Sequence, residues 1–184
     1  MSLLRPSTLP QAFFLSTGSG QRFFLFHPPQ GYALRGCVLY LHPFAEELNC
    51  TRRVVAQQAR ALAQAGYGVL QMDLSGCGDS EGSFADATWE DWLKDAQHAH
   101  HWLREHASGP LWLWGMRAGA LLATALANNL SDPCHLLLWQ PTINGQQMLQ
   151  QFLRLHTASQ WLGAGKTSGK TPAQMLDNDQ PVDI

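Results

Sequence analysis

The chain has little charge and no long hydrophobic run. Asp, Glu, Lys and Arg make up 14% of its 184 residues, against about 25% in an average globular protein. The formal net charge of −2 leaves no basic surplus, which argues against nucleic acid as a partner. No apolar run approaches the ~18 residues of a transmembrane helix, so we expect no membrane span. The first residues do not form a secretion signal either, so we expect a cytoplasmic protein.

Paired cysteines and metal-binding motifs are also missing. The four cysteines lie far apart and form no C-x-x-C pair, which favours reduced thiols over a disulfide or a metal site. The histidines at positions 98, 100, 101 and 106 cluster, but no two are four residues apart, the spacing that places two ligands on one helix face. We therefore expect a solvated helix face there, with no metal and no cofactor.

Short apolar runs alternate with helical patterns along most of the chain. Residues 12–16 and 22–27, joined by a glycine-rich segment, predict an antiparallel hairpin. Further strands are expected at residues 37–41, 68–72, 111–114 and 135–139, and helices at 52–65, 88–106, 118–130 and 145–156. This alternation predicts right-handed βαβ units in a three-layer α/β/α sandwich with a mostly parallel central sheet.

The length suits one domain, which we expect to span residues 1–162. Small and polar residues dominate afterwards, which predicts a flexible or disordered tail over residues 163–184. Residues 163–171 contain two Gly-Lys-Thr triplets, but neither has the earlier glycine that a phosphate-binding loop requires. A solvated loop is the favoured interpretation of that segment.

The most informative motif is Gly115-Met116-Arg117-Ala118-Gly119, between a predicted strand and a predicted helix. Glycines two residues before and after the central residue permit a sharp strand-to-helix turn, the frame of a nucleophile elbow. A serine hydrolase has Ser at the centre of this turn. Arg117 stays protonated and cannot attack a carbonyl, so the motif presents the frame of a catalyst without its attacking atom.

Two interpretations of Arg117 remain open. In the first, Arg117 forms a salt bridge or stacks in a pocket that is no longer catalytic. In the second, it binds a carboxylate or phosphate at a helix N-terminus, as an anion clamp. In the second case the backbone N–H groups of Phe44 and Ala118 would be the donors, as in an oxyanion hole, because Pro43 has none. His42 and Met116 would lie beside them. The alternative for residues 42–46 is a plain strand-to-helix turn.

The loop after the second parallel strand, residues 73–82, adds a possible pocket edge. Asp73, with Glu46 from the preceding loop, is assigned to that edge, and we interpret Asp73 as an organiser of the turn and not as a catalyst. Cys77 is a soft nucleophile in the same loop, but no elbow presents it and no base is assigned to it.

Four segments together carry a family resemblance: Leu-His-Pro-Phe-Ala-Glu-Glu-Leu-Asn (41–49), Met-Asp-Leu-Ser-Gly-Cys-Gly-Asp-Ser-Glu-Gly (72–82), Trp-Gly-Met-Arg-Ala-Gly-Ala (114–120) and Leu-Leu-Trp-Gln-Pro (137–141). In this order they resemble the α/β-hydrolase superfamily over about residues 10–160. More narrowly, the chain is similar to the second hydrolase-type protein associated with exosortase A systems of Gram-negative bacteria. That resemblance implies ester or thioester substrates, a link to envelope protein sorting and exopolysaccharide, and an arginine at the elbow as a feature of the group.

The chain departs from a working hydrolase in two ways. The elbow carries Arg117, where the superfamily has Ser, Cys or Asp. A catalytic acid and a late histidine should follow the elbow, yet the histidines after it are His135, on a predicted strand, and His156, on a predicted helix. Strand 135–139 would also be an exposed apolar edge, so we expect either a truncated version of a longer chain or a protein partner covering that strand.

Three functions therefore remain open. The first is a hydrolase of an exosortase-linked system with a non-standard elbow. The second is a non-catalytic pseudo-hydrolase that binds a small anionic ligand or a protein partner. The third is a serine-type esterase or thioesterase that uses an unrecognised nucleophile.

Overall fold

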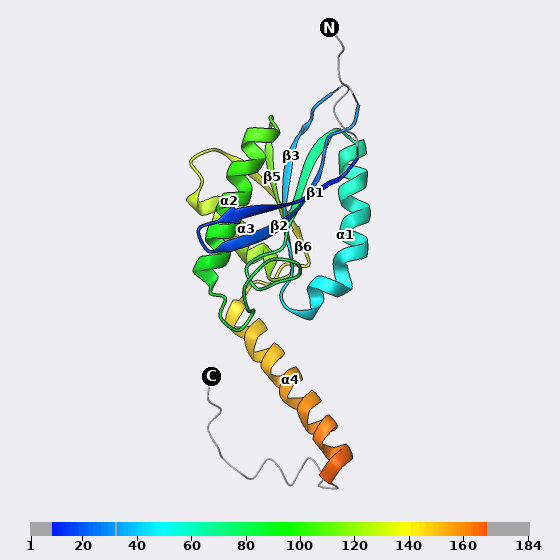
Figure 1. The fold of residues 1–184 in the computed structure, drawn as a ribbon, viewed down its shortest axis with the longest axis vertical. Coiled ribbons are helices and arrows are strands. Elements are labelled where there is room, and N and C mark those ends of the chain that lie inside the picture. The colour runs from blue at the N-terminus through cyan, green and yellow to red at the C-terminus, as the bar shows by residue number, and fades with distance from the viewer. Residues whose placement is uncertain (1–8, 32, 169–184) are drawn as a thin grey trace. The chain divides into compact units, whose positions relative to one another are not determined.

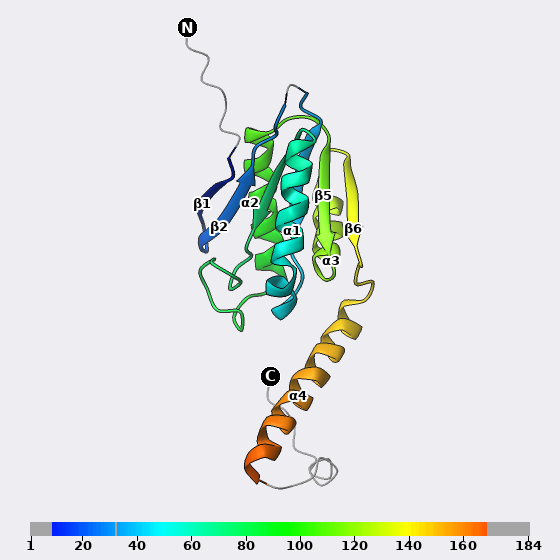
Figure 2. The ribbon, with the colours of Figure 1, turned by 90° about the vertical axis from the view of Figure 1, so that its right-hand side faces the viewer.

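The computed structural model describes residues 9–31 and 33–168. Six strands form one sheet in the order β1-β2-β4-β3-β5-β6. Their bounds are β1 (Gln11–Thr17), β2 (Gly20–His27), β3 (Gly36–Leu41), β4 (Tyr67–Met72), β5 (Leu111–Met116) and β6 (Cys134–Trp139). The β1–β2 and β2–β4 pairs are antiparallel, and β4, β3, β5 and β6 run parallel. Figure 2 shows the hairpin at one end of the sheet and β5 and β6 at the other.

Three helices cover the sheet: α1 (Glu46–Gln64), α2 (Trp89–His106) and α3 (Gly119–Asn129). Helix α1 packs on one face, whereas α2 and α3 pack on the other (Figure 1). This is the predicted three-layer α/β/α sandwich with a mostly parallel sheet, so the fold class is confirmed. Residues from Asn144 form a second compact unit, with helix α4 (Gly145–Ser168).

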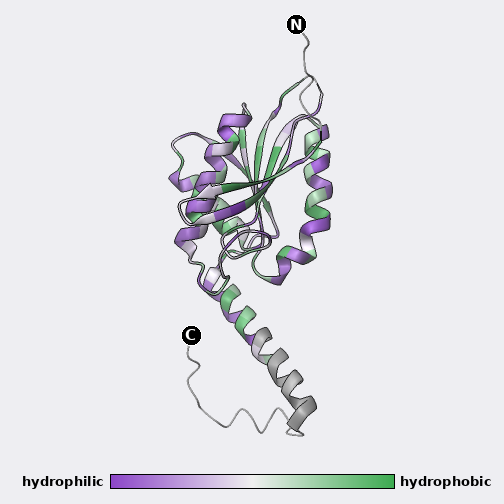
Figure 3. Cartoon of the chain, viewed as in Figure 1, coloured by the Kyte–Doolittle hydropathy of each residue, from purple (hydrophilic) through white to green (hydrophobic). Residues whose placement is uncertain are grey.

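The alternation of β3 explains the two cores. Val38 and Tyr40 belong to the cluster under α1, and Leu39 and Leu41 belong to the cluster under α2 and α3. All residues of β3 are buried, as expected for a central parallel strand with helices on both faces. Figure 3 accordingly shows apolar central strands and polar residues along the helices.

A buried ion pair links the hairpin to helix α2. Arg22 of β2 is fully buried and donates from Nε to both carboxylate oxygens of Asp95 on α2, each at 2.9 Å. Asp95 also accepts from the Ser75 backbone N–H at 2.8 Å. The pair therefore fixes the loop after β4, which borders the candidate site.

Two helix boundaries differ from the sequence prediction. Helix α2 begins after Thr88 with the expected Thr88–Asp91 capping box. Helix α1, however, begins at Glu46 and not at Arg52, because its two acidic residues occupy the first turn, where they interact favourably with the helix dipole. Helix α4 continues to Ser168, past the expected end near residue 156, so residues 163–168 are helical. Residues 169–184 of the expected tail lie outside the described residues.

Strand β6 is an edge of the sheet within the part of the chain that the structure describes. Leu136 and Leu138 on it are 42% and 37% exposed, as the prediction of an exposed apolar strand implies. No helix among the described residues combines the length and the hydrophobicity that crossing a bilayer requires.

Candidate functional site

The turn between β5 and α3 has the geometry of an elbow. Arg117 adopts φ 54°, in the left-handed region that side chains other than glycine rarely occupy. A Cβ on Gly115 would come within 2.5 Å of the Ala120 Cα, and one on Gly119 would overlap the Leu41 carbonyl oxygen. Both glycines are therefore required for helix and strand to approach this closely.

Hydrogen bonds to the segment after β6 hold the turn in place. The Arg117 N–H donates to the Trp139 carbonyl at 3.0 Å, and the Arg117 carbonyl accepts from the Thr142 and Ala120 N–H groups at 3.0 and 3.1 Å. Because both backbone groups of Arg117 are bonded, its unusual φ is supported by neighbours on two elements.

The guanidinium of Arg117 is directed to helix α1. Its Nε lies 3.1 and 3.4 Å from the two carboxylate oxygens of Glu47, and Nη2 lies 3.1 Å from Oε1. The two side chains are 37% and 43% exposed, so the pair contributes little to stability, about 1 kcal/mol at most. Glu46, which the sequence placed at the pocket edge, is exposed, and the neighbouring Glu47 is the partner of Arg117. The early start of α1, which the sequence analysis missed, places Glu47 opposite the elbow.

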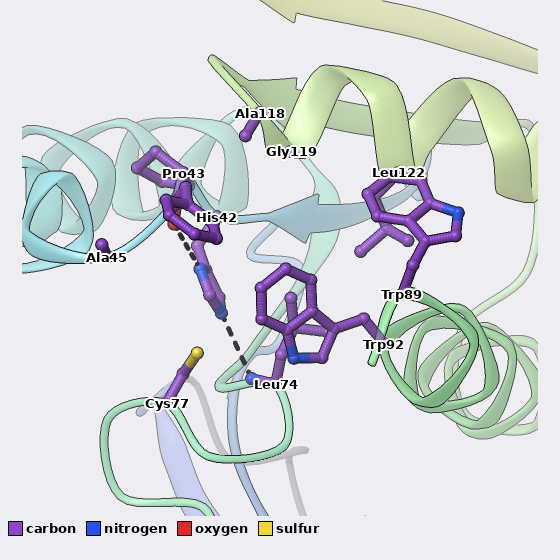
Figure 4. Close-up of a pocket in the computed structure, with 11 residues that line it drawn as sticks. His42, Pro43, Ala45, Leu74, Cys77, Trp89, Trp92, Ala118, Gly119 and Leu122 are labelled. Carbon is purple, nitrogen blue, oxygen red and sulfur yellow. Dashed lines mark hydrogen bonds between the residues drawn. The ribbon is translucent and has the colours of Figure 1, made fainter. Parts of the chain in front are cut away.

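A small pocket lies under the elbow; we call it the elbow pocket (Figure 4). Its volume is about 20 Å³, which is room for about one water molecule. Aromatic rings crowd it, with Phe44 5.1 Å from Phe84 and 5.9 Å from Trp92 between ring centroids. The lining residues are His42, Pro43, Phe44, Ala45, Leu74, Cys77, Trp89, Trp92, Ala118, Gly119 and Leu122.

The elbow pocket brings together only some of the predicted site residues. His42, Phe44 and Ala118 line it, whereas Arg117, Met116, Asp73 and Glu46 do not. The Met116 sulfur instead lies 3.7 Å from the Tyr40 hydroxyl, within the cluster under α1. The predicted anion site is thus divided between a nearly filled pocket and an exposed ion pair.

His42 has both ring nitrogens engaged. Nδ1 donates to the Pro43 carbonyl at 2.7 Å, and Nε2 accepts from the Leu74 N–H at 3.2 Å. Complete burial lowers the pKa of this imidazole, which favours the neutral form. His42 therefore ties the loop after β3 to the loop after β4 and has no nitrogen free to act as a base.

The surroundings of Cys77 keep its thiol protonated, and those of Asp73 engage its carboxylate in hydrogen bonds. Burial, reinforced by the Asp73 and Asp95 carboxylates, raises the pKa of the Cys77 thiol to about 11, so at neutral pH it is protonated and unreactive. Its sulfur lies on the His42 side of the loop (Figure 4). Asp73 accepts from Arg52 Nη2 at 3.1 Å and from the Asp79 N–H at 3.0 Å, which agrees with a turn-organising role. Arg52 was missed, because it lies on a helix distant in sequence.

The described residues contain no group of three His, Cys, Asp or Glu side chains that could hold a metal ion. Of the clustered histidines on α2, those at positions 98, 101 and 106 are exposed.

Known proteins resemble this chain over part of their length. Lysophosphatidylserine lipase ABHD12 of Danio rerio is 34% identical over 112 residues, and that of Xenopus tropicalis is 32% identical over 112 residues. Each match covers 58% of this chain and 28% of the relative, so the chain spans less than a third of these lipases.

Solved structures show the same fold. An α/β serine hydrolase without lid from Xanthomonas campestris has a TM-score of 0.62 at 26% identity, covering 72% of this chain and 61% of that one. A carboxyl esterase from Bacillus coagulans has a TM-score of 0.63 at 16% identity, covering 95% and 61%. The family model described as serine aminopeptidase S33 matches residues 33–182. The chain therefore belongs to this family of hydrolases.

Proposed function

We propose that this member of the serine aminopeptidase S33 family uses its elbow to bind a ligand and not to transfer an acyl group. The observation that carries the proposal is Arg117, which occupies the turn from which a serine hydrolase presents its nucleophile. A guanidinium is neither a nucleophile nor a base at physiological pH. Cys77 and His42 share the pocket below, but the thiol is protonated and the imidazole is fully bonded.

The ligand class that fits is a small carboxylate or phosphate. The guanidinium is partly exposed, and Glu47 occupies its Nε–Nη2 edge. An incoming anion would exchange with Glu47 or bind the remaining edge, since arginine binds carboxylate and phosphate groups in a fork. The matched lipases are named for lysophosphatidylserine, which carries both groups. Their name supports an anionic ligand, although this chain matches only part of each.

Calorimetric titration with inorganic phosphate and with citrate tests the proposal. We expect weak binding to the native chain and roughly tenfold tighter binding to the Glu47→Gln variant, because the competing carboxylate is gone. Arg117→Met should abolish binding in both backgrounds. Arg53→Met, which removes an exposed arginine of α1 without a described ion pair, is the matched control. Binding that survives Arg117→Met, or no binding to any form, would refute the anion site.

The narrower resemblance extends this proposal. A cytoplasmic pseudo-hydrolase linked to exosortase and exopolysaccharide systems would recognise an anionic intermediate or a partner without cleaving it. The exposed leucines of β6 support the partner alternative. A Leu138→Lys variant would then lose a partner that co-purifies with the native chain, and unchanged co-purification would contradict it.

A further inference from the structure

A second hollow lies on the other side of His42, between helix α1 and the sheet; we call it the α1 cavity. It measures about 230 Å³. By comparison, an apolar cavity of about 150 Å³ is enough to bind benzene. The lining residues are Leu25, Tyr40, His42, Leu48, Thr51, Arg52, Val55, Ala56, Gln71, Met72 and Asp73.

Its walls come from two regular elements. On the sheet, Gln71 of β4 pairs in register with Leu25 of β2 on one side and with Tyr40 of β3 on the other, so these side chains form a row across the face under α1. The opposite wall consists of α1 residues at positions 48, 51, 52, 55 and 56, the spacing of a single helix stripe. The cavity is therefore built by the sandwich itself.

Contacts within the fold fix two side chains that line the sheet wall of the cavity. The Gln71 amide donates from Nε2 to Nε2 of His27 at 2.9 Å. The Tyr40 ring packs 4.6 Å from Trp114 between ring centroids, and its hydroxyl lies 3.7 Å from the Met116 sulfur. The helix wall contributes the short side chain of Ala56. Collapse would require breaking these contacts.

The rim of the cavity is charged but balanced. Arg52 lies 3.1 Å from the Asp73 carboxylate through Nη2 and 3.3 Å from Asn49 Oδ1 through Nε. A ligand with a net charge would lose hydration without meeting an unpaired opposite charge, which is costly in a partly buried site. The cavity therefore favours a neutral molecule.

Thr51, Gln71 and Tyr40 each present an oxygen that can accept a hydrogen bond at the cavity. The Thr51 hydroxyl donates to the Glu47 carbonyl at 2.7 Å and also interacts with the Tyr40 hydroxyl, and the Gln71 amide nitrogen faces His27. The Tyr40 phenol stays protonated, since burial raises its pKa, and its oxygen can also accept. A ligand that pairs with one of these oxygens donates a hydrogen bond to it.

The structure assigns the α1 cavity as a binding site for a small neutral alcohol or phenol. Its hydroxyl would donate to the Thr51, Gln71 or Tyr40 oxygen, and its hydrocarbon body would contact apolar side chains such as Leu48, Val55 and Met72. This site is independent of the anion site proposed at Arg117, since the two share none of the residues that bind the ligand.

Titration of the full chain with phenol, followed by ligand-observed NMR, tests this assignment. We expect saturable binding to the native chain and roughly tenfold weaker binding to Ala56→Leu, whose added side chain enters the cavity. The matched control is Ala125→Leu on α3, which lies outside the cavity and should leave phenol affinity unchanged. If the native chain does not bind phenol, or if Ala56→Leu binds it equally well, the assignment fails and the cavity holds only water.

Toluene has nearly the shape of phenol but no hydroxyl, so comparing the two ligands separates the contribution of the hydrogen bond from that of the fit. The native chain should prefer phenol to toluene, and Thr51→Val, which keeps the shape and removes the hydroxyl, should reduce that preference by roughly fivefold while leaving toluene binding intact. An unchanged preference in Thr51→Val and in Tyr40→Phe would overturn the hydrogen-bonding part of the assignment.

Discussion

The two hollows beside His42 differ in size and in construction. The elbow pocket, under the turn that usually serves catalysis, has a volume of about 20 Å³ and is crowded by aromatic rings. The α1 cavity, on the opposite side of the imidazole, has a volume of about 230 Å³ and is kept open by tethered side chains. A hydrolase-type backbone turn therefore does not by itself provide a substrate site; accessible volume and free polar atoms decide where a ligand can bind.

Removing the imidazole that lines both hollows should have the largest effect. His42→Ala leaves the Leu74 N–H and the Pro43 carbonyl without partners and adds a void, so we expect the free energy of unfolding to fall by about 3–5 kcal/mol. Urea denaturation measures this loss. His101→Ala, at an exposed position of α2, should change stability by less than about 0.5 kcal/mol. Similar small losses in both variants would mean that His42 does not join the loops.

The same substitution should have opposite effects in the two hollows. Ala118→Leu overfills the elbow pocket and should lower the free energy of unfolding by about 1–3 kcal/mol. Ala56→Leu fills part of the α1 cavity and should raise it by about 0.5–1 kcal/mol. Thermal and urea unfolding of the two variants provide the measurement. If both variants lose stability equally, the contrast in volume is wrong.

Acidification should destabilise the chain through its buried histidines. Burial lowers the pKa of His42 and of His27 in the folded state, whereas unfolded histidines take up protons near pH 6.5. The free energy of unfolding is therefore at its full value above that pH. It decreases as the pH drops below it, by up to about 1.4 kcal/mol per pH unit for each histidine. Urea titrations between pH 7.5 and 5.5 should show this slope, and His42→Gln should reduce it. A slope that is the same in His42→Gln would show that His42 contributes nothing.

The elbow ion pair should matter least for stability. Glu47 and Arg117 are both partly exposed, so Glu47→Gln should change the free energy of unfolding by no more than about 1 kcal/mol. The same variant is expected to strengthen anion binding at Arg117. If Glu47→Gln instead lowers the free energy of unfolding by several kcal/mol, the ion pair stabilises the fold. That result would remove the support for a binding role.

The sequence predicted features that depend on local spacing. The flanking glycines of the elbow, the Thr88–Asp91 capping box and the alternating strands and helices are all contained within short segments, and the structure has each of them. The first turn of α1 was missed, because Glu46 and Glu47 follow Pro43 and resemble a loop in the sequence. That boundary places Glu47 opposite Arg117, a pairing that the sequence did not indicate.

Features that join distant segments could not be predicted. The Arg22–Asp95 pair links residues 73 positions apart, and the Gln71–His27 contact links residues 44 apart. No periodicity in either segment identifies the partner, since each contact exists only after the hairpin has joined the sheet. The α1 cavity depends on such contacts, so sequence reasoning had no signal for it.

Labelling with a fluorophosphonate probe tests the central claim most directly, because the probe reacts covalently with activated serine nucleophiles. The chain should remain unlabelled under conditions in which an active serine hydrolase of the same fold is labelled completely, since Arg117 occupies the elbow and the Cys77 thiol is protonated. Stoichiometric labelling, mapped to one residue by mass spectrometry, would show that a nucleophile operates in this protein and would contradict a non-catalytic elbow.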